Sequence, residues 1–175
     1  MRLVATAPPS IESADDPRDA RVLRLFAEHG DGVFRLALLM LGRTADAEDI
    51  VQETFLRVLR HLANGGSLPN ARGWIFTVAA HACRDRQRAG RRWLPWLPER
   101  DTRVAPDRTD AADGTQSIMR ALRQLNPRDR LLIALCVEGC SYQEIAAAAD
   151  VAPASTGRII ARARERLAHA LGVAR

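Results

Sequence analysis

Apolar residues recur along most of the chain at the three- and four-residue spacing of amphipathic helices, and no alternating strand pattern extends beyond a few residues. Alanine, the strongest helix former, occupies 30 of the 175 positions. The pattern therefore predicts an all-α protein. The predicted helices span 18–29, 32–42, 45–63, 71–89, 116–125, 127–138, 142–149 and 154–170.

Short polar sequences mark where these helices begin and end. A Gly-Asp-Gly sequence at 30–32 separates the first two helices, and Asn-Gly-Gly at 64–66 ends the third. Asn70 and Asn126 directly precede helices, where their side chains can cap free backbone amides. A Ser-x-x-Glu sequence at 141–144 has the spacing of a capping box.

A change in composition divides the chain into two helical parts. Residues 90–115 contain three prolines and four aspartates without a helical apolar pattern, which is typical of a linker. We therefore expect two small helical domains joined by a flexible linker. The predicted segments are a flexible tail at 1–17, a first domain at 18–92, a linker at 93–115 and a second domain at 116–171.

Charge is distributed unevenly along these parts. All 26 basic residues are arginine, and with 21 acidic residues they give a net charge of +5. Residues 11–53 carry five arginines and ten acidic residues, whereas residues 54–100 carry nine arginines and two acidic residues. The last 25 residues hold five arginines and one glutamate. Acidic and basic blocks of this kind indicate two different partner surfaces.

Several classes of protein find no support in the sequence. No apolar run approaches the roughly 18 residues of a membrane span, and the N-terminus lacks a secretory signal, so we expect a cytoplasmic protein without membrane insertion. Cys83, Cys136 and Cys140 lack zinc-type spacing; we interpret them as buried small residues, with redox activity of the last two as the alternative. Because no nucleotide-binding loop or catalytic motif is present, we expect no cofactor and no enzymatic activity.

The predicted helix at 45–63 separates an apolar from a polar face. Its first-turn acids suit the helix dipole, so a solvated face and a docking surface are both compatible with the periodicity. An exposed leucine among the charges is the observation that points to docking. The polar face carries Asp49, Gln52, Glu53, Leu56 and Arg60, and the apolar face carries Ala47, Ile50, Val51, Thr54, Val58 and Leu62.

The predicted helix at 71–89 carries a tryptophan and several arginines along one face. An indole beside guanidinium groups can stack a base while the cations follow phosphates, although such a tryptophan is more often a residue at the core border. Residues 84–92 hold five arginines and one aspartate, which repel one another without an anionic partner. This favours a nucleic-acid surface. Its candidate residues are Trp74, Thr77, His81, Arg84, Arg88, Arg91 and Arg92, with Arg86 extending the charge.

The predicted helices at 142–149 and 154–170 and the short turn between them match the dimensions of a helix-turn-helix. In that motif the second helix enters the major groove, reads base edges near its N-terminus and meets phosphates further along. The alternative is an ordinary helical hairpin with a solvated basic face. The residues expected to face DNA are Ser155, Arg158, Arg162 and Arg166.

In order and spacing, these segments resemble bacterial sigma factors of the extracytoplasmic-function type, group 4 of the sigma-70 family. The most specific motif is DAEDIVQETFLR at 46–57, which resembles region 2.2. In the family, this helix binds the clamp coiled coil of the largest subunit of core RNA polymerase. The resemblance implies that the polymerase is faced by Asp49, Gln52, Glu53, Leu56 and Arg60.

Two further motifs extend the resemblance through the first domain. GWIFTVA at 73–79 looks like region 2.3, and RDRQRAGRR at 84–92 looks like region 2.4. The resemblance implies that this surface captures the unwound non-template strand of the minus-ten promoter element. His81 stands where the family typically has asparagine, which replaces a fixed donor and acceptor pair with a tautomer-dependent one on a larger ring.

The second domain resembles region 4 of the same family. LNPRDR at 125–130 and SYQEIA at 141–146 resemble the opening of region 4.2, which implies recognition of the minus-thirty-five element. Gly157 and Ile159 stand where the family usually has lysine and arginine. A glycine in the first turn of a helix costs about 1 kcal/mol relative to alanine, so the set of residues that reads this element is unusual.

The resemblance implies a dissociable, non-enzymatic initiation subunit that binds core RNA polymerase and promoter DNA. An anti-sigma factor is expected as a further partner by resemblance only. Two other functions stay open: a DNA-binding helix-turn-helix regulator that acts without polymerase, and a sigma-mimicking protein that sequesters an anti-sigma factor. The motif at 46–57 argues against the regulator, and the altered segment at 154–160 keeps the mimic open.

Overall fold

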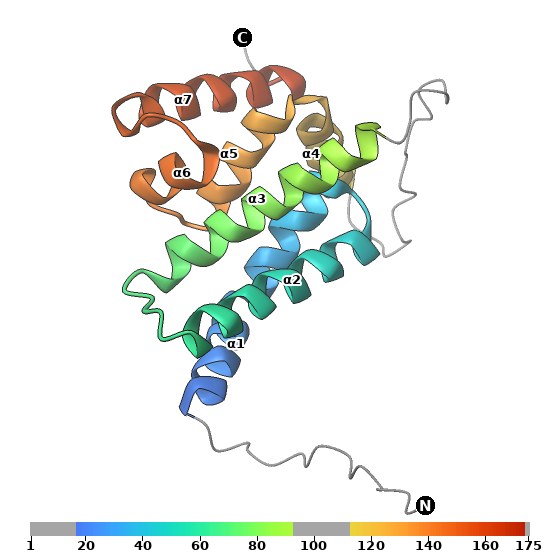
Figure 1. Ribbon diagram of the computed structural model, residues 1–175. Helices are drawn as coiled ribbons and strands as arrows, with labels where there is room; N and C mark the ends of the chain where they lie inside the picture. The colour runs from blue at the N-terminus through green and yellow to red at the C-terminus, as the bar shows by residue number, and fades with distance from the viewer. Residues whose placement is uncertain (1–16, 93–112, 174–175) are drawn as a thin grey trace, which may run out of the picture.

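The computed structural model describes residues 17–92 and 113–173, which form seven α-helices with no strand among them (Figure 1). The all-α fold class is thus confirmed, whereas the predicted tail and nearly all of the predicted linker lie outside the described residues. We call α1–α3 the N-terminal unit and α4–α7 the C-terminal unit. The helices are α1 (Pro17–Leu41), α2 (Thr44–Ala63), α3 (Ala71–Arg92), α4 (Asp113–Gln124), α5 (Pro127–Val137), α6 (Tyr142–Ala149) and α7 (Pro153–Ala170).

A single continuous helix, α1, replaces the two helices predicted at 18–29 and 32–42, so the predicted break was wrong. Glycine inside a helix costs about 1 kcal/mol relative to alanine, but Gly30 and Gly32 are both buried. A Cβ atom added at Gly32 would lie 2.7 Å from the Glu138 carboxylate and 3.0 Å from the Phe76 ring. Gly32 therefore allows close packing inside a helix, and local sequence does not show such a tertiary requirement.

The predicted ends of α2 and α3 follow from local backbone geometry. After α2, Gly65 adopts a left-handed φ of 78°, which stops the helix. Before α3, the Asn70 side chain accepts a hydrogen bond of 2.9 Å from the Gly73 amide, which confirms the predicted cap. α3 then continues to Arg92, beyond its predicted end at 89. All six residues predicted for the apolar face of α2 are buried.

In the C-terminal unit, α5 and α6 begin with the caps that the sequence predicts. The Asn126 side chain accepts a hydrogen bond of 2.9 Å from the Asp129 amide at the start of α5. Ser141 and Glu144 form both hydrogen bonds of the capping box at the start of α6. α6 ends at Ala149, and the next residue, Asp150, has a φ of 52° and is the one non-glycine residue with positive φ in the described ranges. This turn directs the chain into α7 and completes the helix-turn-helix.

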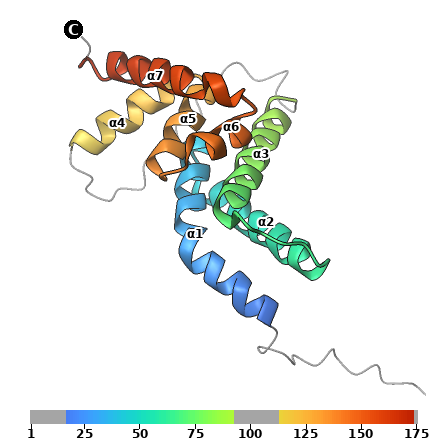
Figure 2. The ribbon, with the colours of Figure 1, turned by 90° about the vertical axis from the view of Figure 1, so that its left-hand side faces the viewer.

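The two units pack against each other, with α6 against α3 and α5 against α1 (Figures 1 and 2). Their buried apolar residues form one cluster, to which α3 contributes Ile75 and Phe76 and α6 contributes Ile145 and Ala148. The sequence analysis did not predict this contact. Periodicity shows that a helix has an apolar face, but it does not show which element covers that face.

Candidate polymerase and promoter surfaces

The polar face of α2 forms a strip along the N-terminal unit. Leu56 has 49% of its surface exposed, and an exposed leucine among charged residues offers apolar area that a partner can cover. Phe55 points the other way and packs edge to face on Phe26 of α1, with ring centroids 4.9 Å apart. The strip consists of the five residues predicted from the sequence, of which only Glu53 is half-buried: Asp49, Gln52, Glu53, Leu56 and Arg60.

Two residues of the strip have partners inside the chain: Glu53 pairs with Arg57 one turn along α2, and Asp49 is bound by α3. Arg86 of α3 donates hydrogen bonds to the carboxylates of Asp46, at 2.9 Å, and of Asp49. These bonds, to Asp46 first and Asp49 second, raise the pKa of Arg86. Arg86, which the sequence analysis grouped with the promoter arginines, therefore joins α3 to the first turns of α2.

The predicted base-stacking face of α3 begins at Trp74. The indole is half-buried and lies beside the imidazole of His61 in α2, with ring centroids 5.1 Å apart. Trp74 also lines an open cleft of about 440 Å³ between the two units. The side chain therefore packs at the core border and also lines a hollow surface, whereas base stacking by Trp74 stays a prediction.

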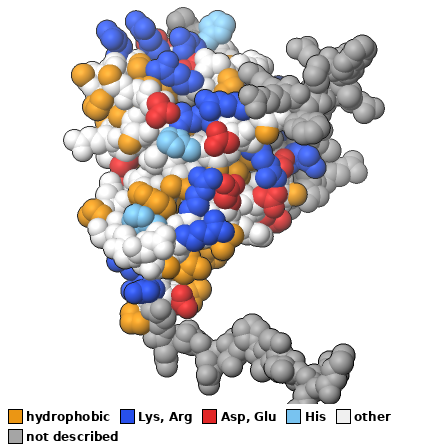
Figure 3. Space-filling view, in the orientation of Figure 1, with side chains coloured by type: hydrophobic (Ala, Val, Ile, Leu, Met, Phe, Trp, Pro, Cys, Tyr) orange, Lys and Arg blue, Asp and Glu red, His pale blue; other side chains and the backbone are white. Residues whose placement is uncertain are grey.

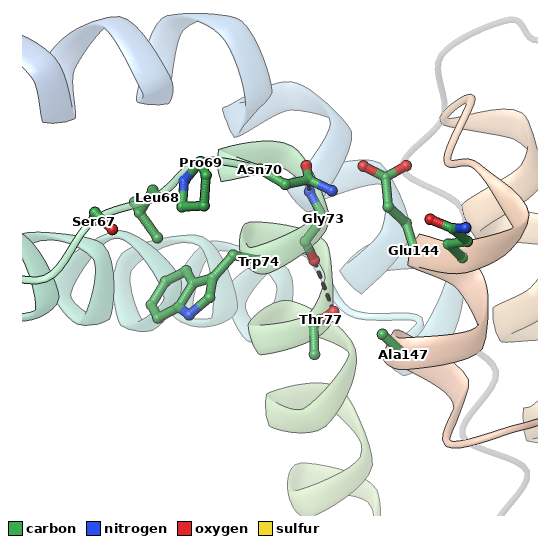
Figure 4. A pocket seen from close by; sticks show the side chains of 10 residues that line it. Ser67, Leu68, Pro69, Asn70, Gly73, Trp74, Thr77, Glu144 and Ala147 are labelled. Carbon is green, nitrogen blue, oxygen red and sulfur yellow. Dashed lines mark hydrogen bonds between the residues drawn. The ribbon is translucent and has the colours of Figure 1, made fainter. Parts of the chain in front are cut away.

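This cleft is walled by both units (Figure 4). Thr77 lies one turn after Trp74, and its hydroxyl donates a hydrogen bond of 2.7 Å to the Gly73 carbonyl. Glu144 and Ala147 of α6 form the opposite wall. Burial alone would raise the pKa of Glu144, but hydrogen bonds from Ser141, and a further one from Asn70, lower the pKa overall. The cleft therefore has one acidic wall supplied by the C-terminal unit.

Further along α3, His81 and Arg84 contact the C-terminal unit. Arg84 pairs with Asp150 at 2.8 Å and donates a hydrogen bond of 3.0 Å to the Ala148 carbonyl. His81 Nε2 lies 3.8 Å from the Asp150 carboxylate and has no hydrogen-bond partner among the described residues. The sequence analysis interpreted position 150 only as part of a turn and missed this contact, because the two segments are far apart in the chain.

Of the three remaining arginines at the end of α3, the structure describes the side chain of Arg88. Arg88 is 77% exposed in its side chain and lies 3.5 Å from Asp85, one turn away on the same helix. Arg91 and Arg92 belong to α3, but their side chains lie outside what the structure describes. Only Arg88 of the three is therefore seen in a position open to a nucleic-acid partner.

The helix α7 presents arginines that the rest of the described chain does not engage. Arg158 and Arg162 are exposed, and neither forms a hydrogen bond or ion pair with any described residue. Ser155 is half-buried, and its hydroxyl donates a hydrogen bond of 3.1 Å to the Ala152 carbonyl in the turn. Figure 3 shows basic side chains gathered over α7, whereas acidic and basic side chains lie side by side over α3.

Arg166, predicted to face DNA with these residues, has a partner inside the C-terminal unit. It forms an ion pair with Asp129, whose side chain is only 3% exposed. The same carboxylate accepts a hydrogen bond of 2.7 Å from the Asn126 side chain. A buried carboxylate is costly without such partners. Arg166 thus holds α7 against the start of α5, a role that a helical wheel does not show.

The unusual glycine of α7 has a neighbour that accounts for its small size. A Cβ atom added at Gly157 would lie 3.3 Å from Cε2 of Tyr142, at the first position of α6. The Tyr142 ring remains 55% exposed. Gly157 therefore makes room for an aromatic ring beside the N-terminal turn of the predicted recognition helix.

Other candidate chemistry receives little support from the described residues. Burial raises the pKa of the Cys83 thiol to about 12 and that of Cys140 to about 11, which disfavours the reactive thiolates. Within the described ranges, no group of three His, Cys, Asp or Glu side chains is placed to hold a metal ion. Among the same residues, no helix combines the length and apolar character needed to cross a membrane.

Two protein-family models match successive parts of the chain. Residues 25–94 match sigma-70 region 2, and residues 115–167 match sigma-70 region 4. The RNA polymerase sigma factor CarQ of Myxococcus xanthus is 35% identical over 155 residues, which cover 85% of this chain and 87% of that protein. The ECF RNA polymerase sigma factor SigL of Mycobacterium tuberculosis is 36% identical over 124 residues, which cover 66% of this chain and 68% of that protein.

Two complexes are among the solved structures that share the fold. The sigma factor RpoE in complex with the anti-sigma factor NepR from Bartonella quintana has a TM-score of 0.70 at 23% identity and covers 90% of this chain and 98% of its own. CnrH in complex with the cytosolic domain of CnrY has a TM-score of 0.65 at 22% identity and covers 88% and 89%. At such low sequence identity, this similarity shows a shared arrangement of the helices and nothing further.

Proposed function

The chain belongs to the extracytoplasmic-function group of the sigma-70 family of RNA polymerase sigma factors, and on this basis we propose that α2 binds the polymerase and that α3 and α7 bind promoter DNA. Sigma factors direct core RNA polymerase to promoters. We assign residues 18–92 to polymerase binding and the minus-ten element, 93–115 to the linker, and 116–171 to the minus-thirty-five element. The family matches at 25–94 and 115–167 support this division.

The strip on α2 is the proposed site for core RNA polymerase. Its central residue, Leu56, is half exposed within the motif that most closely resembles region 2.2, and this is the observation on which the assignment rests. Burying such a leucine in an interface contributes hydrophobic free energy, while the flanking charges select the partner. The polymerase surface that fits is the clamp coiled coil implied by the family resemblance.

Promoter DNA is the proposed partner of two further surfaces. Trp74, Thr77 and His81 supply a stacking and hydrogen-bonding surface for unpaired bases, with Arg84, Arg88, Arg91 and Arg92 following the phosphates. On α7, Ser155 and Arg158 are near the N-terminus and reach base edges, while Arg162 meets a phosphate further along. Arg166 stabilises the position of α7 through its ion pair with Asp129. Only the exposed part of its side chain can reach DNA.

Strand opening in this scheme needs no hydrolysis by the chain. Melted DNA is favoured because the N-terminal unit binds unpaired bases better than paired ones, and a ligand shifts an equilibrium by its difference in affinity for the two states. The chain is therefore a binding subunit rather than an enzyme. It acts where the polymerase and chromosome are, in the bacterial cytoplasm.

An anti-sigma factor is the third proposed partner. The two solved structures compared above are complexes, and one is a sigma factor in complex with an anti-sigma factor. An anti-sigma factor would compete with the polymerase for the strip on α2 or with DNA for α3.

Transcription reconstituted from purified core RNA polymerase, this chain and genomic promoter fragments tests the proposal. Mapped transcript starts should share a minus-ten and a minus-thirty-five element. Core binding without specific transcripts would contradict the proposal in favour of a sigma mimic. DNA binding without core binding would contradict it in favour of an autonomous regulator.

A further inference from the structure

The imidazole of His61, in the last turn of α2, reaches across to the loop that leads into α3. His61 Nε2 lies 3.1 Å from the Ser67 carbonyl oxygen. Because a carbonyl oxygen only accepts hydrogen bonds, Nε2 must carry the proton and donate it to this bond. The bond therefore fixes the orientation of the imidazole ring.

The loop leaves room for this ring at Gly66. A Cβ atom added at Gly66 would lie 2.4, 2.5 and 2.6 Å from three atoms of the His61 ring, so any larger residue would displace the imidazole. The Gly66 amide also donates a hydrogen bond of 2.9 Å to the His61 backbone carbonyl. The loop thus folds back on residue 61 and confines its side chain.

The confined ring contacts the indole of Trp74. The two ring centroids are 5.1 Å apart and the ring planes are tilted by 33°, a separation typical of favourable aromatic pairs. Both side chains are half-buried. Trp74 lines the cleft beside the segment that carries Ser67 and Leu68 (Figure 4). His61 therefore acts on the cleft by holding the indole.

The rest of the loop has anchors of its own. Leu68 is 4% exposed, and its carbonyl accepts a hydrogen bond of 3.4 Å from Arg21 of α1. Asn70 caps the start of α3. Loss of the imidazole should therefore leave the loop in place and release the indole.

From these contacts we propose that His61 is a positioning residue, which holds the Trp74 indole in the orientation that stacks on an unpaired promoter base. This inference rests on the proposed function of α3. A tryptophan side chain without this support can occupy three staggered χ1 positions. If only one of them presents the ring to the base, the apparent affinity for the strand falls about threefold, because affinity is reduced by the competent fraction.

Binding of a fluorescent single strand with a mapped minus-ten element, by the full chain assembled with core RNA polymerase, tests the proposal. Trp74→Ala should weaken binding at least about fivefold through the loss of stacking. His61→Ala should weaken it about threefold. His61→Phe keeps a ring and should bind as the wild type does, whereas His61→Gln keeps a donor without a ring and should behave like His61→Ala. All variants should bind a minus-thirty-five duplex equally.

Combining the two alanine substitutions shows whether His61 acts through Trp74. In the Trp74→Ala background, His61→Ala should cause no further loss of strand binding, because there is no indole left to hold. Equal losses in the two backgrounds would mean that His61 contacts the strand itself, which would overturn the positioning role.

Tryptophan fluorescence of the free chain reports on the indole directly. Trp93→Phe and Trp96→Phe leave Trp74 as the only tryptophan. In this background, His61→Ala should add a fast component to the time-resolved anisotropy, since a released side chain changes rotamer within picoseconds to nanoseconds. His61→Phe should not add it. An unchanged decay in His61→Ala would overturn the proposal.

A second imidazole beside α3 supplies the matched control. His29 of α1 lies beside the ring of the buried Phe76, with centroids 6.4 Å apart, and neither residue lines the cleft in the described part of the chain. His29→Ala should change neither strand binding nor the anisotropy of Trp74. Circular dichroism should show unchanged helicity in every variant. An equal loss of strand binding in His29→Ala and His61→Ala would follow general destabilisation and would overturn the proposal.

The outcomes distinguish this inference from the proposed function. Unchanged strand binding in Trp74→Ala would contradict base stacking by α3, and the positioning role would fall with it. A loss in Trp74→Ala without a loss in His61→Ala would leave stacking standing and overturn the positioning role alone. Wild-type binding in His61→Gln with a loss in His61→Phe would assign the effect to the Ser67 bond, and the ring contact would be refuted.

Discussion

The two arginine-rich helices, α3 and α7, are alike in sequence but differ in what their arginines contact. Arg84 of α3 pairs with a carboxylate in the turn after α6 and Arg86 with carboxylates of α2, whereas Arg158 and Arg162 of α7 have no partner in the described part of the chain. Local charge density therefore predicts only that a helix can bind anions. The tertiary structure decides whether the anion belongs to the same chain.

This difference changes how each helix can meet DNA. A carboxylate held beside an arginine by the fold is present at a high effective concentration, so DNA must displace it. An unpaired arginine needs only to release its hydration and counterions. On this comparison the exposed arginines of α7 are free to meet DNA, whereas Arg84 of α3 must first release Asp150.

The largest predicted effect concerns the strip on α2, in which Asp49 also forms an ion pair with Arg86 of α3. Asp49→Arg combined with Glu53→Arg reverses two charges beside Leu56 and should weaken association with core RNA polymerase by at least about 100-fold, because like charges across an interface cost several kcal/mol. Fluorescence anisotropy with labelled chain measures this. The control is Arg86→Gln, which breaks the same pair with Asp49 without changing the strip and should bind core normally. If both variants lose the same affinity for core, the strip is not the binding site.

The next effect separates structural from DNA-binding arginines within α7. Arg166→Ala leaves the buried Asp129 carboxylate short of a partner and should lower the free energy of unfolding by about 2 kcal/mol. Arg162→Ala, an exposed change on the same helix, should stay within about 0.5 kcal/mol of the wild type. Urea denaturation measures both values. Indistinguishable stabilities would show that the Arg166 pair contributes nothing to the fold.

A third prediction contrasts base reading by α7 with phosphate contact by α3. Arg158→Ala should relax sequence preference at one position of the minus-thirty-five element, at a cost of about 1–3 kcal/mol for the preferred base. Arg88→Ala should weaken holoenzyme binding to all promoters equally and reduce the salt slope by about 1. Binding to a library of promoter variants at several salt concentrations measures both. The same uniform loss in the two variants would refute this division of roles.

The smallest effect tests the Gly157 and Tyr142 contact on α7. Gly157→Ala gains helix propensity but crowds the Tyr142 ring, so stability should rise by only about 0.5 kcal/mol. In a Tyr142→Ala background the ring is gone, and the same change should gain the full amount of about 1 kcal/mol. Equal gains in both backgrounds, measured by thermal unfolding, would mean that the ring does not limit this position.

The sequence predicted most where the determinants are local. The apolar face of α2 and the caps at Asn70 and Asn126 were read correctly, because each depends on residues within one or two turns. The break predicted at 30–32 was wrong because Gly32 lies inside α1. Its lack of a side chain makes room for Glu138, which lies more than a hundred positions away in the chain. The pairing of Arg84 with Asp150 could not be foreseen for the same reason.

The different availability of the two promoter surfaces is tested most directly by binding two DNA probes to the wild-type chain without and with core RNA polymerase, after subtraction of binding by core alone. The probes are a minus-ten single strand and a minus-thirty-five duplex from one mapped promoter. Core should raise affinity for the single strand by at least about tenfold, since in the free chain this probe must displace Asp150 from Arg84, and should change affinity for the duplex far less. Equal gains for both probes, or tight binding of the single strand by the free chain, would contradict the account.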